Sequence, residues 1–309
     1  MKKLIPIVSL FLFASLYSVA SEIGDRTIPA DVAQLSDSLK RQYAPDKRVA
    51  LFDVDYSFSG KNVMLRGVTT SAEAKAALLN GLSKADYQVM DCLQVLPDEA
   101  ALEGKIYGII NVSVSNLRVD PDFSSEMMTQ GLMGMPVRVL QRDGWYRIQT
   151  PDNYIAWVHR VGIHPVTKEE LHVWNRAEKI VVTSHYGFVY SEPNQSSQTV
   201  SDVVAGNRLK WEGTKGAFYK VVYPDGRTGY ISKSISMPEK KWRAALKQDA
   251  ASIIRTAHTL MGVPYLWAGT SSKGIEAIVS PFSATIRPNS PLAISSVACP
   301  PIRVERLRS

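Results

Sequence analysis

Cysteine and histidine are scarce in this sequence. Its 309 residues include two cysteines and five histidines. A small secreted domain held together by disulfides needs more cysteines than this, so the chain is not a disulfide scaffold. The sequence has neither a CxxC pair nor an HxxxH pair, which removes the commonest zinc-binding patterns. We therefore expect no metal and no cofactor.

The two cysteines also lack the surroundings of a nucleophile. Cys92 lies within residues 87–95, whose composition favours a β-strand, and we expect a buried structural thiol there. Cys299 precedes two prolines in a stretch without helical or strand periodicity. Neither cysteine has a histidine close to it in the sequence that would accept its proton.

Long hydrophobic runs are scarce as well. The main apolar stretch, residues 5–16, is well short of the ~20 residues that a membrane-spanning helix needs. It follows two lysines and precedes the small residues Ser18-Val19-Ala20, an order typical of a secretory signal peptide. We predict a signal peptide over residues 1–20 with cleavage near Ala20, a secreted or periplasmic protein, and no transmembrane segment.

The positive charge is modest once the chain ends are set aside. The formal net charge is +7, of which Lys2 and Lys3 contribute +2 and the tail from Glu276 another +2. No basic stripe interleaves with aromatic residues, so we expect no nucleic-acid partner. With 45% hydrophobic and 21% charged residues the composition is that of a folded protein. The length of the mature chain favours two to four small domains.

Residues 21–115 predict a small α/β domain. The expected strands are the apolar runs at 49–54, 62–68, 87–95 and 106–114. Between the second and third runs, an alanine-rich segment places Ala74, Leu78 and Leu82 at helical spacing. We expect this helix to pack on a small sheet.

An internal repeat follows. Residues 134–158 carry a glycine-led strand, a Trp-Tyr pair, a Pro-Asp turn and an Ala-Trp-Val ending; residues 206–231 carry the same order with Phe-Tyr and Gly-Tyr-Ile. The offset is 72 residues in the first block and 73 afterwards. Short strands joined by tight turns predict a small, partly open β-barrel in each copy. The copies resemble bacterial SH3-like domains, which we assign to residues 116–170 and 171–238.

After residue 239 the pattern becomes helical. Apolar residues recur at three- and four-residue intervals from Trp242 to Ala257, and the helix is expected to end before Gly262-Val263-Pro264. The string Pro264-Tyr265-Leu266-Trp267-Ala268-Gly269 follows. It resembles the Pro-Tyr-x-Trp-Gly-Gly segment of NlpC-type cell-wall cysteine peptidases, so residues 239–275 are identified as the start of a papain-like NlpC catalytic domain.

The catalytic motif of that family is not recognisable after residue 275. In the family an Asp-Cys-Ser-Gly motif opens the next helix, whose N-terminus favours the thiolate, and a later histidine relays the proton. Here the register places Glu276, Ala277 and Ile278 at the first three positions, and no histidine follows His258. Because alanine has no nucleophile, we expect no catalytic residue and no peptidase activity. Residues 276–309 are interpreted as an aberrant tail, either out of frame or genuinely divergent.

The resemblance also implies a substrate. Family members with two SH3-like domains, the γ-D-glutamyl-L-diamino acid endopeptidases or dipeptidyl-peptidases VI, cut murein peptides that have a free N-terminal L-alanine. Their pocket uses an acidic residue, a tyrosine and a tryptophan, which match Glu126, Tyr154 and Trp267. A carboxylate pairs with a free ammonium and rejects a blocked amine, while a tyrosine supplies a flat wall and a hydroxyl. Taken singly, these residues would be a solvated loop carboxylate, a barrel aromatic and a core aromatic.

The sequence thus predicts an α+β protein with a small N-terminal α/β domain, two SH3-like β-barrels and the start of an NlpC catalytic domain. Three interpretations of its function stay open. The first is a murein-peptide hydrolase whose gene end is damaged. The second is a non-catalytic protein that binds murein peptides through its SH3-like domains. The third is a product that does not accumulate, because apolar surface on residues 243–275 is left uncovered.

Overall fold

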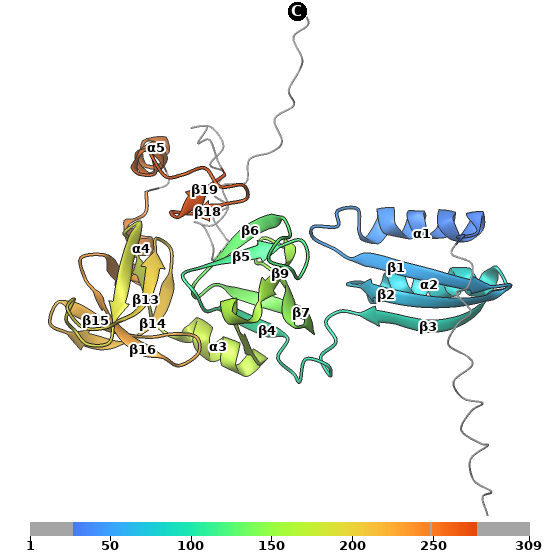
Figure 1. The fold of residues 1–309 in the computed structure, drawn as a ribbon, viewed down its shortest axis with the longest axis horizontal. Coiled ribbons are helices and arrows are strands. Elements are labelled where there is room, and N and C mark those ends of the chain that lie inside the picture. Colours follow the sequence, from blue (N-terminus) through green and yellow to red (C-terminus); the bar gives the residue numbers. More distant parts are fainter. Residues whose placement is uncertain (1–26, 248, 277–309) are drawn as a thin grey trace, which may run out of the picture. The chain divides into compact units, whose positions relative to one another are not determined.

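The computed structural model describes residues 27–247 and 249–276 of the chain. The chain separates into two compact units, Met1–Leu96 and Pro97–Ser309 (Figure 1). The predicted signal peptide, Cys299 and the predicted tail beyond its first residue lie outside the described residues. Within the described ranges, no helix has both the length and the apolarity to cross a membrane.

The first unit is a three-stranded sheet with two helices. β1 (Phe52–Ser59) and β2 (Asn62–Thr69) form an antiparallel hairpin, and α2 (Ala72–Lys84) then leads into β3 (Gln88–Val95), which runs parallel to β2. This is the strand, strand, helix, strand order that the sequence predicts. A further helix, α1 (Ala30–Tyr43), precedes them; the sequence pattern does not reveal it, since it buries only Val32 and Leu39.

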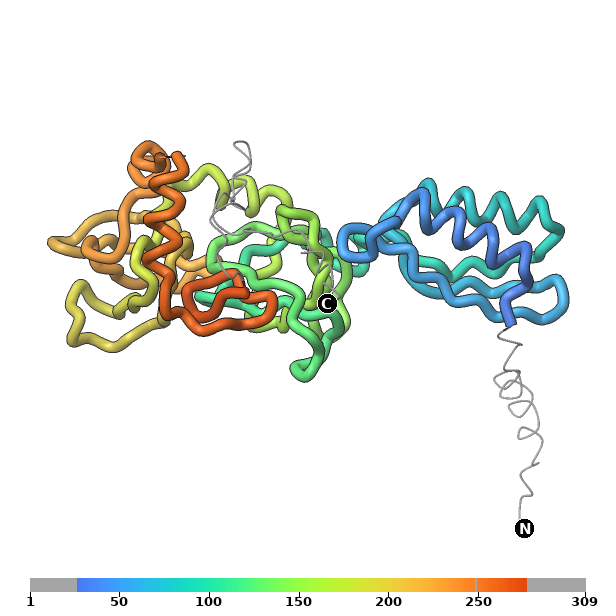
Figure 2. Tube along the Cα trace, turned by 90° about the horizontal axis from the view of Figure 1, so that it is seen from above, coloured from blue at the N-terminus to red at the C-terminus, as the bar shows by residue number. Residues whose placement is uncertain are grey.

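Both helices of this unit pack on the same face of the sheet, side by side in Figure 2. The three positions predicted at helical spacing, Ala74, Leu78 and Leu82, are fully buried. They share one core with the inward residues of β1, including Tyr56 and Phe58, while alternate residues of that strand are exposed. The period of two in the strand and the three- to four-residue spacing in the helix therefore meet in a single apolar layer.

Cys92 corrects one expectation, because its thiol is exposed rather than buried. β3 is an edge strand, and Gln88, Met90, Cys92 and Gln94 on it are all exposed. α1 and α2 cover one face of the sheet, so alternate side chains of β3 point to the other face and meet solvent. A run of β-prone residues is therefore no evidence of burial on both faces.

The second unit starts with a seven-stranded sheet, here called the first barrel. Its strand order is β10-β4-β7-β8-β9-β5-β6. The strands are β4 (Tyr107–Ile110), β5 (Val114–Arg118), β6 (Met127–Leu132), β7 (Pro136–Asp143), β8 (Trp145–Gln149), β9 (Ile155–His159) and β10 (Ile163–Val166). Leu117, Val139, Ile148 and Val158 are fully buried at its centre.

The helix α3 (Lys168–Arg176), closed at its start by a capping box between Thr167 and Glu170, leads into the second barrel. The strand order of this barrel is β13-β12-β16-β15-β14-β11-β17. Its strands are β11 (Lys179–Val182), β12 (Tyr186–Tyr190), β13 (Thr199–Val204), β14 (Arg208–Lys215), β15 (Phe218–Val222), β16 (Thr228–Ser232) and β17 (Ser236–Pro238).

The two barrels have the same topology, strand for strand. A shift in strand register falls after Leu117 in the first barrel and after Val189 in the second, which are 72 residues apart. A second shift falls after Val139 and after Trp211, again 72 residues apart. The duplicated barrels predicted from the sequence repeat are thereby confirmed, down to the irregularities of the strands.

The boundary of the N-terminal domain differs from the prediction. The run at 106–114 was assigned to the α/β domain that ends at residue 115. The structure instead pairs β4 with β7 and β10 of the first barrel, and the first unit ends at Leu96. β4 is the counterpart of β11. In the first barrel β4 lies between β7 and β10, and in the second β11 lies between β14 and β17. The domain to which residues 106–114 belong depends on their strand partners, and the local sequence pattern does not reveal those partners.

A close-packed joint connects the two barrels. Met133, in the turn after β6, is 1% exposed and belongs to the apolar core of the second barrel. Its carbonyl accepts a hydrogen bond of 2.9 Å from the backbone N–H of Arg208. Gly134 follows with φ +85°, and a Cβ there would lie 2.2 Å from the Arg208 carbonyl oxygen. The buried amide of Asn207 adds a 2.8 Å bond to the carbonyl of Ser113.

The segment after the barrels is helical and then forms a small hairpin. The predicted single helix is two helices, α4 (Glu239–Ala245) and α5 (Ala250–Thr259), because the Asp249 carboxylate caps a new helix by accepting the Ser252 N–H over 2.7 Å. No residue of α5 is buried. Two short strands follow, β18 (Thr270–Ser271) and β19 (Gly274–Ile275), joined by a two-residue turn. We call residues 270–275 the hairpin.

Candidate functional site

The three residues implied by the family resemblance lie on three segments of the second unit. Glu126 is exposed at the end of the loop between β5 and β6, and Tyr154 is half-buried directly before β9. Trp267 lies in the segment that precedes β18, and 55% of its surface is exposed. Trp267 is therefore not a core aromatic.

Glu126 and Trp267 are in contact. The indole Nε1 of Trp267 donates a hydrogen bond of 3.0 Å to Oε1 of Glu126, across 141 positions of sequence. An ionised carboxylate has two oxygens with about four lone-pair sites, so one indole bond orients the group and leaves acceptor capacity for a ligand. The pair joins the first barrel to the segment that carries the NlpC-like string.

The loop that carries Glu126 is held by short-range hydrogen bonds. The backbone N–H of Val119 donates to the carbonyl of Glu126 over 3.0 Å, and Arg118 donates to the carbonyl of Ser125. Within the loop, hydrogen bonds from Ser124 hold the pKa of Asp122 below its ordinary value. The hydrogen bonds of Val119 and Arg118 join the two ends of the loop next to Glu126.

Tyr154 is placed by the tight turn before β9. Asn153 adopts φ +73°, a left-handed conformation that asparagine tolerates better than most residues. The backbone N–H and the hydroxyl of Thr150 both donate to the Tyr154 carbonyl, at 2.9 and 3.1 Å. In the sheet β9 is the neighbour of β5, and β5 leads directly into the Glu126 loop.

The turn that carries Trp267 contains a residue in an unfavourable backbone conformation. The N–H of Gly269 donates to the carbonyl of Leu266 over 2.9 Å, and Ala268 between them has φ +55°. The Pro-Tyr-x-Trp-Gly-Gly segment that this string resembles has glycine at this position, and a left-handed conformation costs a non-glycine residue about 1–2 kcal/mol. Gly269 itself cannot take a side chain, because a Cβ would lie 2.4 Å from the carbonyl oxygen of Gly274.

Replacing Ala268 by glycine is expected to stabilise this turn. Relief of the strain should raise the hydrogen-exchange protection of the Gly269 and Glu276 amides by about fivefold or more, since about 1 kcal/mol is involved. Amide exchange followed by NMR measures this. Ala257→Gly in α5 is the control, and there protection should fall because glycine weakens a helix. Lower protection of Gly269 in Ala268→Gly would refute the strain argument.

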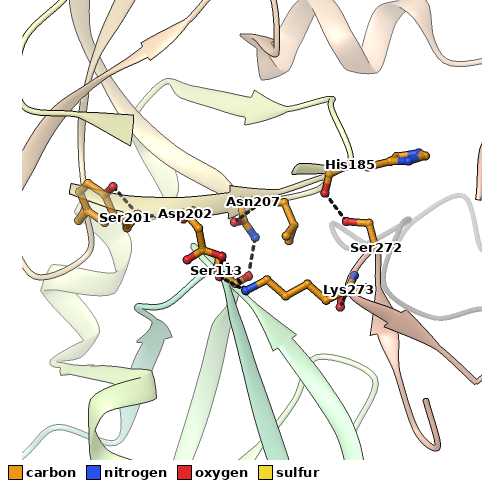
Figure 3. A network of polar contacts seen from close by, with 10 residues as sticks. Ser113, His185, Ser201, Asp202, Asn207, Ser272 and Lys273 are labelled. Carbon is orange, nitrogen blue, oxygen red and sulfur yellow. Dashed lines mark hydrogen bonds and ion pairs between the residues drawn. The ribbon is translucent and has the colours of Figure 1, made fainter. Parts of the chain in front are cut away.

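The hairpin contacts both barrels through polar groups (Figure 3). On the first barrel, the buried Gln130 accepts the backbone N–H of Thr270 at 2.9 Å. On the second, Lys273 Nζ lies 2.6 Å from Asp202 Oδ2, and the same ammonium donates to Ser113 Oγ of the first barrel over 3.0 Å. Ser272 donates to the carbonyl of His185.

Asp202 is the electrostatic centre of this contact. Burial raises the pKa of its carboxyl, but the hydrogen bonds from Lys273 and Ser113 outweigh burial, so the pKa lies below the ordinary value. The carboxylate therefore stays ionised and keeps its partner at neutral pH. Sequence reasoning missed Gln130, Asp202 and Lys273, because each reads locally as an ordinary polar residue.

The described residues of the second unit contain no cysteine, so none of them supplies a thiol nucleophile. No group of three or more His, Cys, Asp or Glu side chains within the described ranges is arranged to hold a metal ion. What these residues present is a carboxylate, exposed aromatic surface and backbone groups fixed by the hairpin.

Family models match both barrels. Residues 117–162 match the bacterial dipeptidyl-peptidase SH3 domain, and residues 185–236 match the bacterial SH3 domain. The fold therefore defines a chain with tandem bacterial SH3 domains.

Two curated relatives extend this class. A γ-D-glutamyl-L-lysine dipeptidyl-peptidase of Bacillus cereus is 24% identical over 172 residues, which cover 53% of this chain and 50% of that protein. Dipeptidyl-peptidase 6 of Lysinibacillus sphaericus is 24% identical over 179 residues, covering 54% and 64%. The chain thus spans less than two thirds of the length of these relatives. With its two SH3 domains and these relatives, the chain is similar to NlpC-type peptidases that carry SH3 domains.

Solved structures of NlpC/P60 proteins are also similar to this chain. One from Bacillus cereus is 20% identical, covers 58% of this chain and 70% of that chain, and gives a TM-score of 0.47. An NlpC/P60 endopeptidase from Photobacterium damselae subsp. piscicida is 12% identical, covers 84% and 63%, and gives a TM-score of 0.43.

Proposed function

We propose that this chain binds short murein peptides by their free N-terminal L-alanine, at a site made by Glu126, Tyr154 and Trp267. The observation that carries the proposal is the 3.0 Å hydrogen bond between Trp267 and Glu126. It brings together two of the three implied residues from segments 141 positions apart, which a solvated loop carboxylate would not require.

The chemistry of the pair suits an ammonium group. Glu126 is exposed, and the second oxygen of its carboxylate can accept a charge-assisted bond from an α-ammonium. The exposed indole of Trp267 and the ring of Tyr154 supply flat apolar surface for the alanine methyl and the peptide backbone. An acetylated amine has no charge and would leave the carboxylate desolvated without a partner.

Binding without cleavage is the form of the function that we propose for this chain. The names of the curated relatives support a peptidase that acts on peptidoglycan peptides. The position aligned with the catalytic cysteine of that family is Ala277, which has no group that attacks a carbonyl. The short apolar run at 5–16, with its lysines and small residues, supports export and removal of residues 1–20.

Calorimetric titration with L-Ala-γ-D-Glu-diaminopimelate, free and N-acetylated, tests the proposal. We expect the free peptide to bind and the acetylated peptide to bind at least about tenfold more weakly, as hydrogen bonds to charged groups are worth about 1.5–3 kcal/mol. Incubation should release no L-Ala-γ-D-Glu above a buffer control. Equal affinities, or no binding of either peptide, would refute the ammonium site, and released dipeptide would show that the chain is a hydrolase.

A further inference from the structure

Four barrel residues that form hydrogen bonds or an ion pair with the hairpin belong to two repeat-related pairs. Gln130 is the fourth residue of β6, and Asp202 is the fourth residue of β13. Ser113 directly precedes β5, and His185 directly precedes β12. Both pairs have the 72-residue offset that relates the strand irregularities of the two barrels. The hairpin therefore binds the same two places on each barrel.

The equivalent places carry different chemistry, matched to what the hairpin presents. Gln130 offers a neutral amide oxygen to the N–H of Thr270, and its own amide nitrogen is bound to Asn116 over 3.0 Å. Asp202 offers a charge to the ammonium of Lys273. The asymmetry fixes which part of the hairpin meets which barrel, since placing Lys273 at Gln130 would leave its ammonium against an uncharged amide.

The hairpin is in turn bonded to the segment that carries Trp267. The N–H of Leu266 donates to the carbonyl of Ile275 over 3.1 Å, and the N–H of Ile275 donates to the carbonyl of Pro264, also over 3.1 Å. The N–H of Glu276 reaches Gly269 at 2.9 Å. Trp267 lies between these anchors, so the barrels that hold the hairpin also hold the indole beside Glu126.

We propose that Gln130 and Asp202 are positioning residues that hold Trp267 at Glu126, and that the second barrel acts on the peptide site in this way. This inference rests on the proposed function for its effect on binding. The second barrel supplies none of the three implied site residues, yet Asp202 and the carbonyl of His185 fix the hairpin. Removing these bonds to the hairpin should weaken recognition of the ammonium, although neither Asp202 nor the His185 carbonyl touches the peptide.

Indole N–H signals in ¹H–¹⁵N spectra of the full chain provide the test. The chain has six tryptophans, and Trp267→Phe assigns the signal of Trp267. In Asp202→Asn we expect this signal to move toward its position in Glu126→Ala, with the other five in place, and the affinity for the free peptide to fall about three- to tenfold. Lys273→Met breaks the same ion pair from the hairpin side and should move the signal equally, which decides the question if Asp202→Asn does not fold.

The matched control is Glu212→Gln, which removes another ion pair of the second barrel. Glu212 lies 2.7 Å from Lys220, with both side chains 41% exposed, and should affect neither the signal nor the affinity. A Trp267 signal that stays in place in Asp202→Asn and Lys273→Met would overturn the positioning role. A signal that moves while peptide affinity is unchanged would overturn its effect on binding. A signal that moves in a chain that never binds peptide would overturn the proposed function and leave the positioning of Trp267 standing.

Discussion

Glu126→Gln is expected to weaken binding of the free-amine peptide by about 10- to 100-fold and to abolish the preference over the acetylated peptide. Glutamine keeps an oxygen that accepts the Trp267 indole bond, so the geometry of the pair is preserved and the charge alone is removed. A hydrogen bond to a charged group contributes about 1.5–3 kcal/mol, which sets the size of the loss. Calorimetric titration of both peptides against wild type and variant measures it.

The second barrel offers a control for this variant at the matching position. Gln198 lies 72 residues after Glu126, and its carbonyl accepts the N–H of Ser191 over 2.8 Å as that of Glu126 accepts Val119. Gln198→Ala should leave both affinities unchanged. If Glu126→Gln bound the free peptide as tightly as wild type, the ammonium would have to be recognised elsewhere, even with the Trp267 contact intact.

Gly134→Ala is expected to lower the free energy of unfolding of the second unit by about 3 kcal/mol or more. The residue has φ +85°, and the added Cβ would lie 2.2 Å from the Arg208 carbonyl oxygen, so strain and overlap combine. Separating the backbones would also draw Met133 out of the core of the second barrel and break its bond to Arg208. All six tryptophans follow residue 97, so denaturant unfolding followed by tryptophan fluorescence reports on this unit.

Gly144→Ala separates the two causes. Gly144 also has a positive φ, +66°, but a Cβ there meets nothing within 4 Å. Its loss should be about 1 kcal/mol, the cost of backbone conformation alone. If Gly134→Ala and Gly144→Ala lowered the free energy of unfolding equally, the two barrels would be able to move apart at the joint without an energetic cost. The peptide site would then have no rigid frame, because the hairpin needs both barrels at a fixed distance.

Much of the fold could be read from the sequence. The alternation in β1 and the spacing of Ala74, Leu78 and Leu82 are local signals, and the structure uses them as expected. The repeat predicted two barrels of one design. The same 72-residue offset would also have linked Gln130 to Asp202, had it been extended upstream of residue 134. Cys92 and the run at 106–114 could not be placed, since burial and strand partners depend on residues far away in the chain.

Local sequence signals were enough to predict an α+β protein with duplicated SH3 domains and an NlpC-like string, with alanine where the family has its cysteine. The sequence also named Glu126 and Trp267, but one at a time. Their contact, and the bonds of Gln130, Asp202 and Lys273 that support it, became visible only in the folded chain. Residue type and local spacing encode helices, strands and repeats, whereas a site built from segments 141 residues apart exists only after the barrels have packed and the hairpin has docked between them.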